Sequence, residues 1–379
     1  MHNTEAVVVG AGIAGVMSAL SLTRRGISVT LVDRWEPGHP RASSTDYNRV
    51  IRSIHGRDEL YTRWVRQARL QWLELQEETG QRLYYECGAL VLATEGHCDW
   101  EDMTTETFEK LGVPFHRFNQ DELSLRFPQF DMTGVKYGLY EPEAGMIMAH
   151  RSVISAVNLF RKLGGKVARG CVQTDASEQV YLDGKLITND LIIISTGSWM
   201  GEMFPRTIGP LSNVIGLNVL YTSTPEGTTQ FDHDFMPCWI DHGHGSFGMP
   251  SVEGHGIKAM TVIPDSIDLD NDERLIRQDT LHKTRRYIET RLPGLVGQKV
   301  VDSKFNQITM TPDTHFIIDW HPEHKNILFA GGCSGHLFKH GPVFGDFVAG
   351  VGLREYGSEA RFRLGKRTKP SPKDSPSGR

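Results

Sequence analysis

The stretch Ala6-Val7-Val8-Val9-Gly10-Ala11-Gly12-Ile13-Ala14-Gly15 decides the fold. A helical segment follows it, and a second apolar run, Val29–Val32, ends at Asp33. The pattern predicts strand, tight turn, helix, strand and an acid about 20 residues after the turn, which is the fingerprint of a dinucleotide-binding unit. Gly10 permits the sharp turn, Gly12 lets the backbone approach a pyrophosphate, and Gly15 lets the helix pack closely on the sheet. We therefore expect a dinucleotide whose diphosphate lies at the helix N-terminus.

The acid at the end of the second strand narrows the choice of dinucleotide. Asp33 is placed to accept hydrogen bonds from a ribose 2′-hydroxyl, which disfavours the 2′-phosphate of NADP. The motif alone leaves NAD and FAD open.

Length and charge describe an ordinary globular protein that acts on a small molecule. The 379 residues are enough for two or three domains. A net charge of -5 and a pI near 6.3 argue against a nucleic-acid partner, because no general basic field would neutralise phosphates. The alternative partner, which we expect, is a small-molecule substrate.

The ends of the chain indicate where in the cell the protein is expected, and its cysteines indicate whether disulfides or a metal site are expected. The first strand begins within five residues of Met1, which leaves no room for a signal peptide, and no run of 18 apolar residues predicts a membrane span. The final Ser377-Gly378-Arg379 is not a peroxisomal triplet, so we expect a cytoplasmic protein. Five scattered cysteines suggest neither disulfides nor zinc, and we interpret residues 241–245 as a loop, so no metal site is predicted.

The rest of the chain predicts an α/β protein. Aromatic and apolar residues at i+4 spacing predict a helix from Asp58 to Gly80 whose tryptophan stripe lies in the core. The apolar run at residues 191–194 predicts a buried parallel strand beside the opening one. Short alternating runs between residues 214 and 310 predict an antiparallel sheet, with a helix at residues 274–292. A second glycine-rich turn, residues 331–341, opens the last helix.

One long segment carries a family resemblance: residues 311–343, TPDTHFIIDWHPEHKNILFAGGCSGHLFKHGPV. It resembles the flavin amine oxidases of the D-amino-acid oxidase superfamily, in the branch with monomeric sarcosine oxidase, N-methyltryptophan oxidase, pipecolate oxidase and fructosyl amino acid oxidases. The likeness extends to about residue 355 and implies FAD. It also implies a Rossmann-type FAD-binding domain (1–84, 146–213, 311–362) interleaved with an α+β substrate domain on an antiparallel sheet (85–145, 214–310). Residues 363–379 are expected to be a disordered tail.

The resemblance also implies which residues contact FAD. Those expected around its ADP half and the neighbouring turns are Gly10, Gly12, Ile13, Ala14, Gly15, Asp33, Arg34, Val172, Gly197 and Trp199. The loop that approaches the flavin contributes His39, Ser43, Ser44 and Arg49, and the turn over its ring contributes Gly332, Cys333, Gly335, His336, Leu337, Phe338 and Lys339.

Three cations match the family's catalytic positions. Arg52 and Lys339 match the pair that grips a substrate carboxylate, and charge-assisted hydrogen bonds of about 1.5–3 kcal/mol each would select an amino acid over a simple amine. Lys258 matches the lysine that activates oxygen, since a fixed ammonium stabilises developing superoxide. The alternative for Lys258 is a surface lysine on an edge strand.

The chain departs from the family at positions that affect cofactor and substrate. Asn306 stands where relatives attach FAD through a cysteine, so we expect non-covalent FAD, with Cys333 as an alternative attachment point. Ser44-Thr45 replaces a histidine pair, and Phe247, Val262 and Ile308 make the substrate pocket more apolar. A bulkier N-alkyl or cyclic secondary amino acid is expected in place of sarcosine.

The resulting expectation is a monomeric oxidase of a secondary α-amino acid. Hydride transfer to flavin N5 would give an imine, and O2 would reoxidise the flavin to give H2O2. One alternative is a flavin dehydrogenase or tailoring oxidase acting on a biosynthetic amine, which the altered pocket favours. Another is a flavin-bound protein without catalysis, which Arg52, Lys258 and Lys339 argue against. The SGHLFK segment disfavours an NADPH-dependent flavin hydroxylase.

Overall fold

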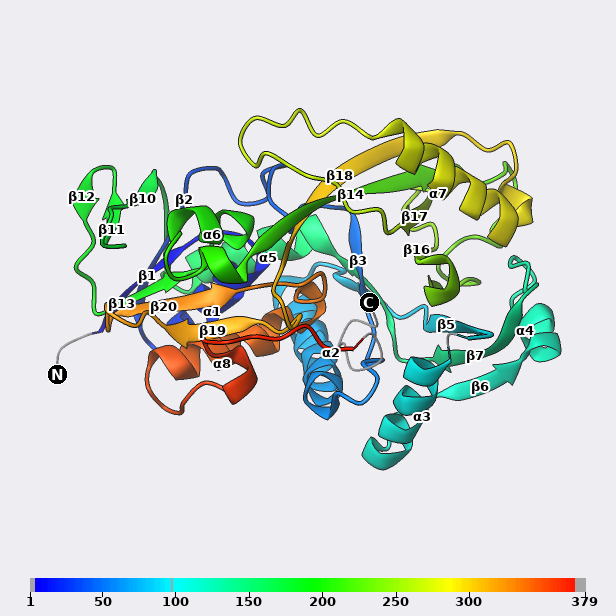
Figure 1. Cartoon of the computed structure of the whole chain (residues 1–379), viewed down its shortest axis with the longest axis horizontal. Helices are drawn as coiled ribbons and strands as arrows, with labels where there is room; N and C mark the ends of the chain where they lie inside the picture. The colour runs from blue at the N-terminus through cyan, green and yellow to red at the C-terminus, as the bar shows by residue number, and fades with distance from the viewer. Residues whose placement is uncertain (1–3, 97, 372–379) are drawn as a thin grey trace.

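The computed structural model describes residues 4–96 and 98–371, and a sheet built on the opening strand forms one part of it (Figure 1). β1 (Glu5–Val9) pairs in parallel with β2 (Ser28–Asp33) on one side and β13 (Leu191–Ile194) on the other. The order β19-β20-β13-β1-β2-β9 is completed by β9 (Lys166–Arg169), β20 (Ile327–Gly331) and the antiparallel β19 (Ile317–Trp320). The two buried apolar runs therefore lie side by side, as predicted.

Helices pack against this sheet. α1 (Ile13–Arg24) contacts α8 (Gly341–Gly352) and α5 (Ala149–Lys162), and α2 (Glu59–Thr79) contacts α8. Gly345 permits the α1–α8 approach, because a Cβ there would lie 2.4 Å from the backbone of Met17. The glycine-rich turn after β20 therefore leads into a helix that supports the first one.

The aromatic stripe of α2 forms part of the core, as predicted. The Asp58 side chain caps the helix by accepting from the Tyr61 amide, and Gly80 ends it in a left-handed conformation. Trp64 and Trp72 are buried against the helices around α1.

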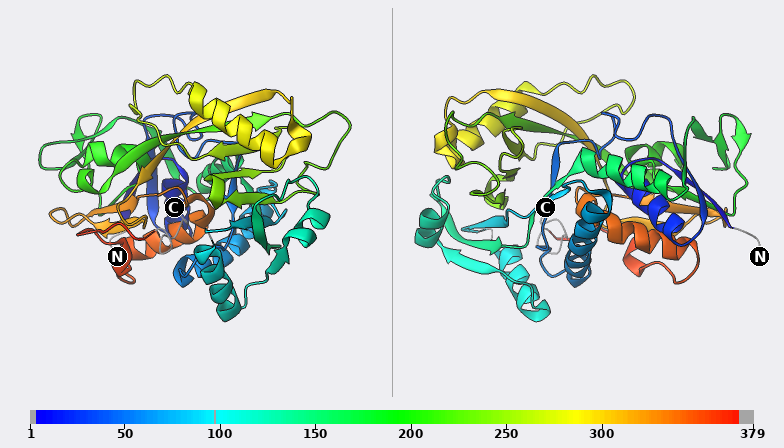
Figure 2. Two further views of the ribbon diagram at one scale, coloured as in Figure 1. Left: turned by 45° about the vertical axis from the view of Figure 1, so that its right-hand side comes forward. Right: turned by 180° about the vertical axis from the view of Figure 1, so that it is seen from behind.

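A second large sheet forms the other part of the molecule (Figures 1 and 2). Its strand order is β18-β14-β17-β16-β15-β5-β7-β6. The strands are β5 (Ala89–Thr94), β6 (His116–Asn119), β7 (Val135–Glu141), β14 (Asn213–Thr222), β15 (Cys238–Asp241), β16 (Ser246–Met249), β17 (Ile257–Thr261) and β18 (Val300–Met310). α3 (Asp99–Leu111), α4 (Gln120–Arg126) and α7 (Gln278–Arg291) accompany it.

Strands β14 to β18 pair antiparallel with one another, as predicted for residues 214–310. β15 joins them in parallel to the earlier strand β5, which local alternation could not reveal. The helix expected from Arg274 begins only at Gln278, because Arg274 has a left-handed backbone (φ 58°) that an α-helix cannot contain.

Smaller elements complete the frame. β3 (Asn48–Ile51), β8 (Gly145–Met148) and β4 (Tyr84–Tyr85) form one small sheet. β10 (Val172–Thr174), β11 (Val180–Leu182) and β12 (Lys185–Leu186) form another, with the β11–β12 hairpin on an Asp-Gly turn. α6 (Met200–Met203) follows β13.

The beginning of the tail is anchored, contrary to the expectation of disorder from residue 363. The Arg367 guanidinium pairs with Asp313 at 2.9 Å and donates to the carbonyls of His315 and Phe316. These acceptors bind the Arg367 side chain, although the basic, proline-rich composition of this segment predicted that it would be disordered in solvent. The remainder of the predicted tail, residues 372–379, lies outside the described residues.

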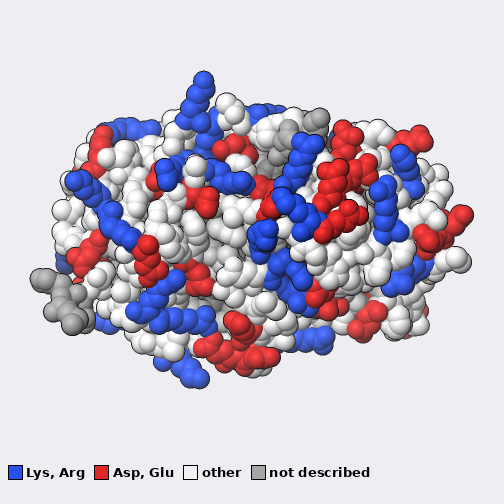
Figure 3. Space-filling model, turned by 90° about the horizontal axis from the view of Figure 1, so that it is seen from below, with Lys and Arg blue, Asp and Glu red and all other residues white. Residues whose placement is uncertain are grey.

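Within residues 4–96 and 98–371, no helix has the length and apolar character needed to cross a bilayer. Acidic and basic side chains are interspersed over the face shown in Figure 3.

Candidate active site

The first glycine turn brings the N-terminus of α1 to a cavity of about 560 Å³. Gly10 has φ +104°, and a Cβ there would lie 2.4 Å from the Ser195 carbonyl oxygen. A Cβ at Gly15 would lie 1.8 Å from the Gly10 carbonyl oxygen, so Gly15 packs under the turn and does not line the cavity. Gly12, Ile13 and Ala14 do line it, at the helix N-terminus, where backbone amides can bind an anion.

Asp33 lies at the same end of the cavity. Its carboxylate accepts hydrogen bonds from the Ala11 amide (2.7 Å) and the Trp35 amide (2.9 Å), which hold the turn in place. Arg34 pairs with Asp270, and the Trp199 indole donates to Asp270 at 2.9 Å. Arg34, Val172, Gly197 and Trp199, which the resemblance assigns to the cofactor, also line the cavity.

His39 is the second expected cofactor residue that the structure places away from the cavity wall. Its ring stacks on Trp35 with centroids 4.9 Å apart and an angle of 5°. Its Nδ1 accepts from the Arg41 amide, so both ring face and nitrogen serve the loop itself.

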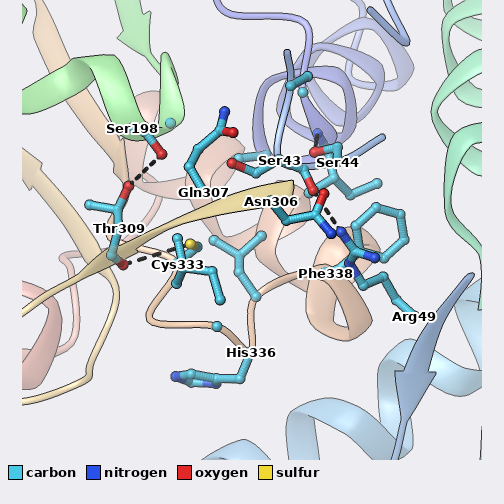
Figure 4. A pocket seen from close by; sticks show the side chains of 18 of the residues that line it. Ser43, Ser44, Arg49, Ser198, Asn306, Gln307, Thr309, Cys333, His336 and Phe338 are labelled. Atoms are coloured by element: carbon cyan, nitrogen blue, oxygen red, sulfur yellow. Dashed lines mark hydrogen bonds between the residues drawn. The ribbon is translucent and has the colours of Figure 1, made fainter. Parts of the chain in front are cut away.

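The loop that follows contacts the turn directly. The Ile13 amide donates to Ser44 Oγ at 3.0 Å, and the Arg49 guanidinium donates to the Ser43 carbonyl at 3.0 Å. Ser43, Ser44 and Arg49 all line the cavity (Figure 4).

The second glycine turn closes the far end of the cavity and is pinned to the end of β18. Gly332 has φ +66°. The Ser334 amide donates to the Thr309 carbonyl at 2.8 Å, and the Cys333 thiol points to the same carbonyl at 3.7 Å (Figure 4). The residues expected to contact the flavin ring, Gly332, Cys333, Gly335, His336, Leu337, Phe338 and Lys339, line the cavity.

Arg52 and Lys339 are brought together although they lie far apart in the sequence. Both side chains are buried and both line the cavity. Their charges act on the same three histidines: burial first, and then Lys339 and Arg52, lower the pKa values of His55, His336 and His340 well below the ordinary value. Two cations at one buried wall form a binding surface for a carboxylate.

The same three histidines could also hold a metal, since their ligand atoms lie within 4.8 Å of one another. Neutral imidazoles are the form that binds metals. However, Arg52 and Lys339 act on this cluster and would oppose a further cation. We therefore assign no metal to it.

Lys258 is buried in the centre of the second sheet, so the edge-strand alternative is wrong. β17 pairs with β14 on one side and β16 on the other. Lys258 Nζ lies 2.8 Å from Asp46 Oδ2 and donates to the Asn48 carbonyl at 2.7 Å. Burial lowers the pKa of Lys258 to about 8, although Asp46 opposes the shift.

Asp46 is a site residue that sequence reasoning missed. Burial would raise the pKa of its carboxyl, but Lys258 and Arg49 hold that pKa far below its usual range. Tyr221 also donates to it, and Asn306 Nδ2 donates at 3.3 Å. Nothing in the local sequence connects Asp46 with Lys258, which lies 212 positions later.

Part of the cavity wall is apolar. Phe247, Val262 and Ile308, the expected pocket residues, line the cavity together with Leu217, Val219, Ile240, Met249 and Met260 from the second large sheet. His242 also lines it, and its Nδ1 lies 2.7 Å from Glu101 Oε1. The prediction treated His242 as part of a loop and overlooked this pair.

Known proteins of similar sequence and fold were compared with this chain. The family model described as "DAO: FAD dependent oxidoreductase" matches residues 5–350. Monomeric sarcosine oxidase from Bacillus sp. (strain B-0618) is 26% identical over 366 residues, covering 92% of each chain. N-methyl-L-tryptophan oxidase from Yersinia pestis (strain Pestoides F) is 22% identical over 366 residues, covering 91% of this chain and 94% of that protein.

The fold comparison agrees with the sequence comparison. L-proline dehydrogenase from P. horikoshii superposes with a TM-score of 0.82 at 20% identity, covering 95% of this chain and 96% of that one. The family match over residues 5–350 shows that this chain belongs to the DAO family of FAD-dependent oxidoreductases.

Proposed function

We propose that this protein oxidises a secondary α-amino acid, N-alkyl or cyclic, to an imine, with O2 as electron acceptor and H2O2 as product. The observation that carries the proposal is the position of Arg52 and Lys339. These buried cations share one cavity with the nucleotide-binding turn, so a carboxylate held by them lies in the space that the cofactor also enters.

The residues present fit FAD. The cavity extends from Gly10 and the α1 N-terminus to the Gly332–Lys339 turn, a shape that suits an extended dinucleotide. Gly12, Asp33 and Val172 would hold the ADP half, and Ser44, Arg49 and the second turn would hold the flavin half. FAD, when bound, supplies a two-electron acceptor for the C–H bond beside the substrate nitrogen.

Non-covalent attachment is part of the proposal. Asn306 offers an amide where a thiolate would be needed, and this amide donates to Asp46. Burial raises the pKa of the Cys333 thiol, which keeps it protonated and weakly nucleophilic. Acid precipitation should leave all the yellow colour in the supernatant, and a yellow pellet would contradict this part of the proposal.

The chain's own residues bind and orient the substrate. Arg52 and Lys339 would grip the carboxylate, and the apolar wall of Phe247, Met260 and Ile308 would receive an apolar side chain or N-alkyl group and exclude water. Fixing the substrate in this way removes much of the entropic barrier to reaction. Sarcosine, which has no side chain, would leave this wall uncovered.

We also propose that the two sheets mark the FAD and substrate domains with the boundaries predicted above.

Lys258 is the residue that we propose to promote reaction with oxygen. Its buried ammonium can stabilise developing negative charge on O2. The second candidate function is a dehydrogenase. One observation favours it: the Lys258 ammonium already pairs with Asp46, which weakens the electric field that would promote the reaction with O2.

Oxygen uptake and peroxide release in air test the proposal. N-methyl-L-leucine, L-proline, L-pipecolate and sarcosine would be compared with the holoenzyme. Equal amounts of O2 consumed and H2O2 formed, with the bulky and cyclic amino acids faster than sarcosine, are expected. Flavin bleaching without peroxide would favour the dehydrogenase, and no reaction with any secondary amino acid would contradict both.

A further inference from the structure

His242 occupies a turn at the wall of the substrate side of the cavity. The turn, His242–His244, connects β15 to β16, and the His242 side chain keeps 18% of its surface exposed. Its Nδ1 lies 2.7 Å from the carboxylate of Glu101 in α3, whose side chain is only 2% exposed. An ionised carboxylate only accepts hydrogen bonds, so Nδ1 carries the hydrogen and the neutral ring keeps a lone pair on Nε2.

Trp100 connects this pair to the residues that would grip the carboxylate. Its ring lies edge-on to His242, with centroids 4.9 Å apart. The Arg52 guanidinium lies 5.5 Å from the centroid of the same ring. His242 and Arg52 therefore both contact one indole, and both line the cavity.

The proposed reaction requires a base. This requirement rests on the proposed function. An amino acid arrives with a protonated nitrogen, and its C–H bond can be oxidised only when that nitrogen has its lone pair. One proton must therefore leave the substrate ammonium before the electrons do.

The other titratable groups along the described cavity wall suit this task poorly. Asp33 holds the first turn through two amides. Lys258 donates to Asp46 and to the Asn48 carbonyl, so its ammonium is committed. His336 is buried, its Nε2 donates to the Thr314 carbonyl at 2.9 Å, and Lys339 opposes its protonation. His242, by contrast, has a buried carboxylate to stabilise its imidazolium.

We propose that His242 is the catalytic base that deprotonates the substrate ammonium, and that Glu101 is the positioning residue that orients its ring. One substrate N–H bond breaks as the Nε2–H bond forms, and no electrons are transferred in this step. The positive charge moves to the imidazolium, which Glu101 balances, and the proton later passes to water. The carboxylate of the preceding residue, Asp241, is engaged elsewhere, because it pairs with Arg291 at 2.9 Å and also binds His244.

Anaerobic flavin reduction in the holoenzyme tests the base. The probe is N-methyl-L-leucine over roughly pH 6 to 10, which spans the ordinary pKa values of histidine and amine groups. His242→Asn should lower the reduction rate constant by about 100-fold near neutral pH, as expected for loss of a general base. The rate should recover as pH rises and the substrate amine deprotonates unaided. Glu101→Gln should cause a smaller loss and move the midpoint of the pH profile.

Controls separate catalysis from structure. His244→Asn alters the same turn at a residue that does not line the cavity, and it should keep the rate and pH profile of the unchanged enzyme. Phenylacetate, which has a carboxylate but no amine, should bind His242→Asn with unchanged affinity. Flavin content and melting temperature report folding, and His242→Gln serves if His242→Asn does not fold.

The outcomes are distinct. An unchanged rate and pH profile in His242→Asn would overturn the base and leave His242 as a structural partner of Glu101. Failure of the unaltered enzyme to be reduced by any secondary amino acid would overturn the proposed function and the base together.

Discussion

Lys258 Nζ lies 2.8 Å from Asp46 Oδ2, and both side chains are buried, with exposures of 5% and 0%. Arg49 pairs with the same carboxylate. The cluster therefore carries two cations and one anion, and its net positive charge faces the cavity. This relationship bears on both the proposed reaction with oxygen and the stability of the fold.

Replacing Lys258 with Met should slow flavin reoxidation by about 100-fold, comparable to the loss of one preorganised electrostatic group. Flavin reduction should change much less, because the proposed role begins after the substrate has been oxidised. Stopped-flow measurement of both half-reactions checks this. Lys304→Met, which alters a half-buried lysine of β18 in the same sheet, is the matched control. Equal effects of K258M on both half-reactions would refute the role.

The reoxidation rate constant should fall as pH rises through about 8, where burial places the pKa of Lys258. Only the protonated form carries the charge that stabilises developing superoxide. Reoxidation measured by mixing reduced enzyme with aerated buffer across this range provides the profile. K258M should show no such fall, and a fall retained in K258M would assign the titration to another group.

Asp46→Asn should lower the free energy of unfolding by about 3–5 kcal/mol, because it leaves the buried Lys258 ammonium without its anion. Lys258 and Arg49 hold the folded pKa of Asp46 below its unfolded value. This stabilisation is therefore complete above about pH 4 and is lost as pH falls toward the folded pKa.

Denaturant unfolding at neutral and acidic pH measures that contribution. Asp302→Asn is the control, since its pair with Lys304 is about one-third exposed and should contribute only about 0–1 kcal/mol. A loss in D46N no larger than in D302N would show that the buried pair does not stabilise the fold.

Lys339→Met should weaken binding of an amino acid by roughly 10- to 150-fold, the equivalent of one charge-assisted hydrogen bond. Perturbation of the flavin spectrum by phenylacetate gives the dissociation constant without turnover. An amine that has no carboxylate should bind the variant and the unaltered enzyme alike. If phenylacetate binds both equally, Lys339 does not grip the carboxylate.

Features with a local signature could be predicted from sequence. The glycine turns, the strands beside β1 and the tryptophan stripe of α2 follow from periodicity and from positions where only glycine fits. Two residues expected to contact the cofactor were misplaced for local reasons. The His39 ring stacks on Trp35, and Gly15 packs beneath the turn, so neither lines the cavity.

Pairs formed across the fold could not be predicted in this way. Asp46 meets Lys258 across 212 positions, and Glu101 meets His242 across 141. Each pair depends on side chains from different elements that the sheet brings together, and one-dimensional patterns carry no information on such contacts. The resemblance identified Lys258 because a known family has a lysine there, but it gave no indication of its partner.

The most direct test of an amino-acid oxidising site is anaerobic bleaching of the flavin by a matched pair of amines. N-methyl-L-phenylalanine and N-methylphenethylamine differ only in the carboxylate that Arg52 and Lys339 would grip. We predict rapid bleaching by the amino acid and at least about 10-fold slower bleaching by the amine at equal concentration, from the loss of charge-assisted hydrogen bonds. Equal bleaching by both, or bleaching by neither together with no response to any other secondary amino acid, would contradict the proposed function.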